Sequence, residues 1–306
     1  MKQKIEKEKV LTTKDLVFKK VFASPQNNHI LIGFINDILD LSVTSVIVEN
    51  AYNIKAFYDT SEEPKMRYTE VDVLARTKDG SQVTIEMQVC NREWFKERAL
   101  YYVTAIYGSN YGTYELEDSS KTYTASGTKY STLRPIYGIF IMVDSLFEED
   151  SEPVHHFGLY DIANSLLYRN SRGQELISMV FLELKKSSSM MKKEIKRWFD
   201  YFNNGKVEAD APNYLKKACE VASFRKLSKE ERDMISAREK AEQDANAREA
   251  YAWYRGVEEG EEKGKALGKK EGETSIIKAM INRGKTVEEI VSLTGIAEDD
   301  IKMALE

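Results

Sequence analysis

Hydrophobic and polar residues alternate along residues 71–88, whose sequence is VDVLARTKDGSQVTIEMQ. Successive side chains of a β-strand point to opposite faces, so this alternation predicts two strands that share one apolar face. Asp79 and Gly80 near the middle are a turn signal, which makes the segment a β-hairpin. The apolar face of this hairpin contains Val71, Val73, Ala75, Val83, Ile85 and Met87.

The length of the turn decides which side chains share the other face. A two-residue loop would place Asp72 and Glu86 on opposite faces of the hairpin. A three-residue loop over 78–80, with Gly80 in the left-handed conformation, shifts the pairing by one residue. Asp72 then lies opposite Glu86, and all the apolar residues share one face. Because only this register buries one face cleanly, we expect the three-residue loop.

Periodic patterns on both sides of the hairpin predict the rest of the core. Apolar residues with helical spacing are found at 15–23, 25–40 and 92–112. Runs typical of strands are found at 136–143, 154–162 and 175–184. Residues 43–58 are either strand or loop, and 115–129 form a polar loop. The order of elements predicts an α/β or α+β core with a mixed central sheet flanked by helices.

Two of these helices begin with residues that favour a helix start. Thr12 or Thr13 is expected to cap the first helix through its hydroxyl group. Ser24 is expected to cap the second helix, with Pro25 at the first helical position.

From about residue 186 the chain becomes helical and heavily charged. Glycine recurs every four residues in this part, at Gly256, Gly260, Gly264, Gly268 and Gly272. Small residues at this spacing allow two helices to approach closely, as in membrane helix pairs. The alternative is a solvated helix that is weakened by its glycines.

The last residues predict a small helical unit. Its helical segments are 275–284, 286–295 and 297–306. Thr286 and Glu289 form a capping box, and Gly284 and Gly295 end helices. The unit does not read DNA as a helix-turn-helix, because its last helix begins with the acidic run 297-AEDD-300. The predicted organisation is a charged tail, a core domain, a charged helical extension and this terminal unit, at 1–12, 13–205, 206–273 and 274–306.

Composition places the chain among soluble proteins of a reducing compartment. Its 306 residues are 42% hydrophobic and 31% charged, with a formal net charge of −5, which argues against indiscriminate coating of nucleic acid. The start of the chain has no apolar segment typical of a signal peptide, and the longest apolar run, 136–143, is too short for a membrane span. Cys90 and Cys219 form no metal-ligand pair, and three histidines are too few for a zinc centre. We therefore expect a cytoplasmic protein.

The opposed acids Asp72 and Glu86 are the candidate site. Carboxylates on directly opposite strand positions have Cβ atoms about 5 Å apart. This arrangement suits a hard divalent cation, which prefers oxygen ligands, and the backbone carbonyl of Met87 can add a third. Such a metal activates water and offsets charge on a phosphodiester. The alternative is a polar hairpin face that is simply solvated.

The chain resembles the PD-(D/E)XK nucleases, and among them the bacterial recombination-promoting nuclease and transposase group. The resemblance extends from about Thr13 to the charged C-terminal helices. The matching segments are 15-DLVFKKVF-22, 33-GFINDIL-39, 70-EVDVLARTKDG-80, 84-TIEMQ-88, 95-FKERALYY-102 and 127-GTKYSTLRPIYGI-139. It implies a restriction-endonuclease-like core, Mg²⁺ as cofactor with Mn²⁺ as an alternative, and DNA as substrate.

The resemblance also implies roles for individual residues. Asp72 and Glu86 match the metal-binding acids, and Gln88 occupies the position where many relatives carry a catalytic lysine. A glutamine orients groups only by hydrogen bonds, whereas lysine brings positive charge, although the group is similar in carrying glutamine here. We expect Gln88→Ala to slow turnover and Gln88→Lys to keep or raise activity.

Lys19, Arg98 and Tyr102 match motif positions on the flanking helices. Arg98 and Tyr102 are four residues apart on one helix face. They either reach a phosphate or support Gln88, or they lie at the edge of the core with their polar ends in water.

Two function classes follow from this pattern. The first is a metal-dependent DNA endonuclease in recombination or transposon-like mobility. The second is a catalytically weak or inactive nuclease fold that acts as a DNA- or protein-binding module. Six basic residues within 185–197 are either a phosphate-binding edge or an ordinary cationic helix start. No membrane partner is expected, and the glycine-spaced extension can mediate a homo-oligomer.

Overall fold

The computed structural model describes residues 12–50, 72–89, 93–112 and 129–304 of the chain. The chain divides into two compact units, Met1–Ile235 and Ser236–Glu306. The predicted charged tail lies almost wholly outside the described residues, as do most of the predicted polar loop 115–129 and the part of 43–58 that follows Asn50.

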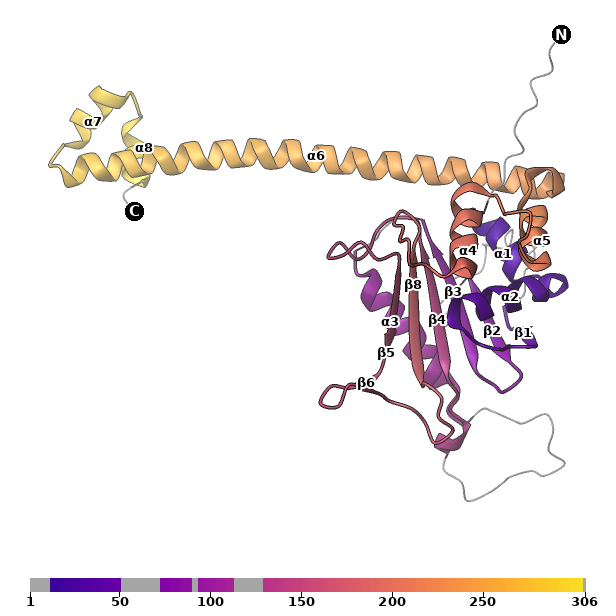
Figure 1. The fold of residues 1–306 in the computed structure, drawn as a ribbon. Coiled ribbons are helices and arrows are strands. Elements are labelled where there is room, and N and C mark those ends of the chain that lie inside the picture. Colours follow the sequence, from indigo (N-terminus) through magenta and orange to yellow (C-terminus); the bar gives the residue numbers. More distant parts are fainter. Residues whose placement is uncertain (1–11, 51–71, 90–92, 113–128, 305–306) are drawn as a thin grey trace, which may run out of the picture. The chain divides into compact units, whose positions relative to one another are not determined.

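A mixed six-stranded sheet forms the centre of the first unit. In spatial order its strands are β1 (Val46–Val48), β2 (Val73–Thr77), β3 (Gln82–Gln88), β4 (Ile136–Met142), β8 (Ile177–Glu183) and β5 (Val154–Gly158) (Figure 1). β3, β4 and β8 are parallel to one another, whereas the three remaining pairings are antiparallel. The predicted mixed sheet is therefore confirmed. A short hairpin of β6 (Tyr160–Asp161) and β7 (Leu166–Leu167) was not predicted.

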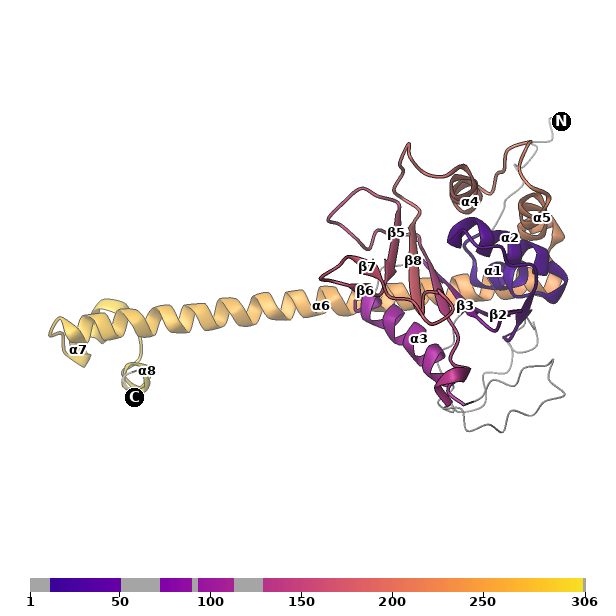
Figure 2. The same cartoon turned by 60° about the horizontal axis from the view of Figure 1, so that its bottom comes forward.

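Helices cover both faces of this sheet (Figure 2). One apolar core joins the sheet to α1 (Asp15–Phe22), α2 (Asn28–Leu39), α4 (Lys193–Asn204) and α5 (Asn213–Ala222). The opposite face packs against α3 (Phe95–Ser109), through residues such as Phe140 and Phe181. The predicted helix 25–40 begins as a short 3₁₀ helix, η1 (Pro25–Asn27), before α2.

The second helical layer buries the polar face of the β2–β3 hairpin. Exposed fractions are 0% for Thr84, 2% for Gln82 and 7% for Gln88. The alternative that this face is simply solvated is therefore wrong. The alternation along the strands identifies which residues share a face, but it does not reveal a helix packed over the polar one.

Both predicted side-chain caps at the N-terminal helices are wrong. Lys14 precedes α1 without a side-chain cap, and the hydroxyl of Thr12 donates to the carbonyl of Phe202 at 2.8 Å. The hydroxyl of Ser24 donates backwards to the carbonyl of Lys20 at 2.7 Å. Each hydroxyl therefore donates to a backbone carbonyl instead of accepting from the N–H groups at a helix start.

The first unit runs past the predicted boundary at residue 205. Apolar residues in and around α5 are buried in the same core as α1 and α2. They are Ala211, Leu215, Ala218, Ala222, Leu227, Met234 and Ile235. A short 3₁₀ helix, η4 (Phe224–Lys226), separates α5 from α6 (Lys229–Asn282). The charged composition of this segment hides the apolar stripe that packs inward.

The second unit contains most of α6 together with α7 (Val287–Thr294) and α8 (Glu298–Met303). Ile277, Ile290 and Ile301 form its small core. The capping box of Thr286 and Glu289 is confirmed. Among the helices of the described ranges, none combines the length and hydrophobicity that crossing a bilayer requires.

The regularly spaced glycines all lie within α6. A Cβ atom placed at any of these five positions would have no neighbouring atom within 4 Å. No other part of the described chain therefore packs against these glycines. Close approach of a second helix along them stays a prediction.

Candidate metal and catalytic site

The β2–β3 hairpin brings the two candidate acids together. Val73 pairs with Ile85 and Ala75 with Val83, so the register places Asp72 opposite Glu86. The N–H of Thr77 donates to the carbonyl of Ser81 at 2.9 Å, which closes a three-residue loop. Gly80 has a φ of 84°, a conformation that glycine adopts without a steric penalty. The predicted loop length and register are confirmed.

Each acid is tied to the backbone of the opposite strand. The N–H of Met87 donates to Oδ2 of Asp72 at 2.9 Å, and the N–H of Asp72 donates to Oε2 of Glu86 at 3.2 Å. The side chains are 16% and 12% exposed. The two carboxylates are thus held in fixed positions at the end of the hairpin, with a small opening to solvent.

Burial and mutual repulsion make the charged form of this pair costly. Burial raises the pKa of Glu86 to about 7, with a further contribution from the nearby charge of Asp72. Burial also raises the pKa of Asp72, although the Met87 N–H and Lys19 oppose the shift. The site therefore favours a positively charged partner at neutral pH.

Lys19 reaches the pair from α1. Its Nζ lies 3.4 Å from Oδ1 of Asp72 and 3.3 Å from Oδ1 of Asp15, one turn earlier on the same helix. Burial tends to lower the pKa of Lys19, but the two carboxylates outweigh it and raise the pKa above its ordinary value. The sequence reading named Lys19 but missed Asp15. The spacing of four residues between an acid and a lysine was the available signal.

Arg98 and Gln88 form a direct contact on the other side of the acids. Nη2 of Arg98 donates to Oε1 of Gln88 at 2.6 Å and lies 4.0 Å from Oε1 of Glu86. The guanidinium packs over the rings of Phe95 and Tyr102, with centroid distances of 4.7 and 5.7 Å. Of the two predicted alternatives, support of Gln88 by Arg98 is what the structure contains. The ring of Tyr102 supports the Arg98 guanidinium in this arrangement.

This contact argues against the expectation that Gln88→Lys keeps or raises activity, which stays a prediction. Gln88 is buried, and its amide oxygen accepts from a guanidinium. An ammonium at the same position would face Arg98 as a buried like charge, which is unfavourable. The sequence by itself does not reveal which side chain packs against position 88.

A comparison with protein families identifies the group. A family model described as PD-(D/E)XK nuclease family transposase matches residues 12–252. The chain belongs to this family. The match confirms the restriction-endonuclease-like core and includes the hairpin, α1 and α3. No curated protein and no solved structure matches the chain.

Nucleases of this family generally use divalent metal ions, and the donor set at the hairpin fits such an ion. Asp72 and Glu86 provide two hard oxygen donors whose repulsion a cation would relieve. Within the described ranges, no group of three or more Asp, Glu, His or Cys residues is arranged to hold a metal. A metal ion held at the hairpin would need backbone, water or substrate oxygens to complete its shell. The Met87 carbonyl as a ligand stays a prediction.

The basic stretch 185–197 does not form a free cationic edge. Every one of its six basic side chains lies within 4.0 Å of a carboxylate. The acids involved are Asp40, Asp144, Asp150, Glu183, Asp200, Glu208 and Asp210. These ion pairs neutralise the stretch, so it lends little support to phosphate binding. Asp40, Asp144 and Asp150 come from distant segments, and Glu183 and Asp200 lie just outside the stretch, which is why a count of charges within 185–197 misled.

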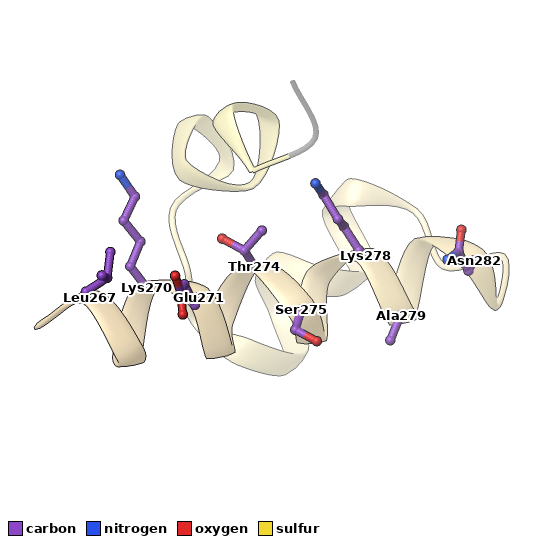
Figure 3. A pocket seen from close by; sticks show the side chains of 8 residues that line it. All are labelled: Leu267, Lys270, Glu271, Thr274, Ser275, Lys278, Ala279 and Asn282. Atoms are coloured by element: carbon purple, nitrogen blue, oxygen red, sulfur yellow. The ribbon is translucent and has the colours of Figure 1, made fainter. Parts of the chain in front are cut away.

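Two surface hollows are lined by residues other than the acid pair. One, of about 700 Å³, runs along α6 between Leu267 and Asn282 (Figure 3). The other, of about 430 Å³, lies beside the β2–β3 turn and includes Asp79, His156 and Ser178. His156 contacts both Ser178 and Glu175 through the same nitrogen, Nε2, so these three residues do not form a catalytic triad. None of the predicted site residues lines either hollow.

Proposed function

We propose that this protein is a divalent-metal-dependent endonuclease that hydrolyses DNA phosphodiester bonds in recombination or transposon-like mobility. The observation that carries the proposal is the opposition of Asp72 and Glu86 across the confirmed hairpin register. Family membership supports the reaction class. We further propose a cytoplasmic location and Mg²⁺ as the cofactor, with Mn²⁺ able to replace it.

In this proposal Asp72, Glu86 and the Met87 carbonyl hold the metal ion. The bound ion supplies an activated water and stabilises charge on the phosphate. The water oxygen would bond to phosphorus as the water gives up a proton to solvent, the bridging P–O bond would break, and the leaving oxygen would take up a proton from solvent. Gln88 orients the attacking water, and Arg98 keeps its amide in one orientation through the 2.6 Å hydrogen bond.

Two further residues belong to the proposed substrate site. Lys19 and Tyr102 lie on α1 and α3, which pack against opposite faces of the sheet and so approach the acids from two sides. Lys19 lies within ion-pair distance of Asp72, and Tyr102 supports Arg98. Both are proposed to contact DNA near the cleaved bond.

The alternative function is an inactive nuclease fold that binds DNA or protein. One observation favours it, namely that the residue two positions after Glu86 is a neutral glutamine engaged by Arg98. Without a cation at that position, charge stabilisation on the phosphate would be weaker.

Nicking of supercoiled plasmid distinguishes the two functions. The wild-type protein is expected to nick in Mg²⁺ or Mn²⁺ and to be silent in EDTA. Asp72→Asn is expected to abolish nicking, because one metal ligand becomes a weaker neutral donor. Asp79→Asn is the matched control, since Asp79 lies on the turn of the same hairpin and contacts Thr77, Ser81 and Gln174. Equal nicking by wild type and Asp72→Asn would exclude this site, and DNA binding without any nicking would favour the alternative.

A further inference from the structure

The acid pair needs a cation that can meet the DNA phosphate. Hydrolysis of a phosphodiester builds negative charge on the phosphate oxygens, and a preorganised positive group stabilises that charge. Asp72 and Glu86 themselves repel a phosphate. Gln88, which is two residues after Glu86 and on the same face of β3, is neutral.

Arg98 is poorly placed to serve as this cation. Nη2 of Arg98 is occupied by Gln88, to which it donates at 2.6 Å. Its planar group also rests on the rings of Phe95 and Tyr102. These contacts make Arg98 a support for Gln88 and keep its nearest approach to Glu86 at 4.0 Å.

Lys19 has the geometry that Arg98 lacks. Its ammonium is 3.4 Å from Asp72 and 24% of its side chain is exposed, so it lies at the rim of the acid pair. Asp15 lies 3.3 Å from the same nitrogen. This second carboxylate holds Lys19 near the site independently of Asp72. A lysine ammonium also carries three donors on a flexible stem, so it can bind a carboxylate and a phosphate oxygen together.

We propose that Lys19 is the phosphate-binding cation of this site and that Asp15 is its positioning residue. The Lys19 ammonium contacts a non-bridging oxygen of the phosphate that is cleaved. This inference rests on the proposed nuclease function, but it assigns the cation to α1 instead of to the strand that carries Glu86.

The neighbouring lysine provides a matched control. Lys20 is on the same helix, but its ammonium lies 2.7 Å from Glu231 and 3.5 Å from the carbonyl of Lys226, on a different segment from the acid pair. Lys20→Met therefore removes the same charge from α1 without touching the site. Lys19→Arg keeps the charge and is the conservative variant.

Two measurements test the proposal. The first is single-turnover cleavage of a duplex in Mg²⁺. Lys19→Met is expected to lower the rate about a hundred- to a thousandfold, Lys19→Arg to retain more activity than Lys19→Met, and Lys20→Met to stay within about threefold of wild type. The second is the salt dependence of duplex affinity in EDTA, where no cleavage occurs. Loss of one phosphate contact should reduce the slope of log K against log salt by about 0.9 for Lys19→Met.

The outcomes separate this proposal from the nuclease function. Unchanged cleavage and an unchanged salt slope in Lys19→Met would overturn the role of Lys19, even if wild type is an active nuclease. Equal losses in Lys19→Met and Lys20→Met would also overturn it. If wild type does not cleave, the nuclease proposal fails, and the salt slope alone then decides whether Lys19 contacts phosphate.

A double-mutant cycle tests the role of Asp15. Asp15→Asn is expected to slow cleavage in the wild-type background and to have little further effect in Lys19→Met, because it acts only through Lys19. Additive losses would show that Asp15 acts independently of Lys19 and would remove its positioning role.

Discussion

Glu86 and Glu183 are both largely buried glutamates near the carboxyl-terminal ends of parallel strands in one sheet, yet their surroundings differ. Glu183 is fully buried and accepts the N–H groups of Leu146 and Phe147. Lys186 lies 2.6 Å from it and His155 lies 3.0 Å from it. Burial tends to raise the pKa of Glu183, but Lys186 and the two N–H groups outweigh it and lower the pKa.

Glu86 has the opposite balance. It accepts one backbone N–H, and its pKa is raised by burial and by the facing Asp72. Arg98 is no closer than 4.0 Å. The contrast teaches that burial by itself does not mark a functional acid. Glu183 has partners that offset its desolvation and holds a loop to the sheet, whereas Glu86 lacks a sufficient partner and is therefore suited to receive a cation.

The largest expected difference between the two glutamates is in catalysis. Glu86→Gln should lower the cleavage rate by about a thousandfold or more, because a metal ligand is worth several kcal/mol in the transition state. Glu183→Gln should stay within about tenfold when rates are normalised to folded protein. Single-turnover cleavage of both purified variants makes the comparison. Similar rates for the two would remove the distinction.

Gln88 extends the comparison of Glu86 with Glu183, because it lies level with Glu183 in the sheet. Gln88 pairs with Met142 on β4, and Met142 pairs with Glu183 on β8. Gln88→Ala should cost roughly 2.7–4 kcal/mol of transition-state stabilisation, about a hundred- to a thousandfold in rate. Gln88→Lys should also lose activity, because its ammonium would face Arg98. Gln82→Ala, on the same face of β3, serves as the control. Wild-type activity in Gln88→Lys would show that the Arg98 contact does not constrain this position.

The folding stability of Glu183→Gln and of Glu86→Gln should change in opposite directions. Glu183→Gln should lower the free energy of unfolding by about 3 kcal/mol, because Lys186 loses its buried partner. The midpoint of urea unfolding at neutral pH measures this loss of stability. Asp200→Asn is a control, because Asp200 pairs with the exposed Lys196 and should contribute under about 1 kcal/mol. An equal, small loss in both variants would mean that Glu183 is not a structural anchor.

The smallest effect is a pH-dependent gain for Glu86→Gln. The pKa of Glu86 is about 7 in the folded protein and near 4.5 when unperturbed, so the folded state binds more protons between these values. The stability of wild type therefore falls as pH rises from 4.5 to 7. In metal-free buffer above pH 7, Glu86→Gln should be more stable by on the order of 2–3 kcal/mol. The gain should vanish near pH 4.5, and a gain that is independent of pH would contradict the mechanism.

The alternation of residue types by itself determined the hairpin and its acid pair. A period of two assigns each side chain to a face, and a left-handed glycine at position 80 selects the loop that opposes Asp72 and Glu86. These are local constraints, so they can be read from a short stretch. The strand order and the match to a nuclease family agree with the core predicted from the same patterns.

The tertiary structure alone decided which charges meet at the site and which cancel elsewhere. Asp15 and Lys19 reach Asp72, and Arg98 reaches Gln88, only because α1 and α3 pack on opposite faces of one hairpin. Within 185–197, Lys192 and Lys193 are neutralised by Asp40 and Asp210, which other segments provide. Electrostatic partners depend on distances of a few ångströms between elements remote in the chain. The periodicity of a sequence specifies which face a side chain occupies, but not what packs against that face.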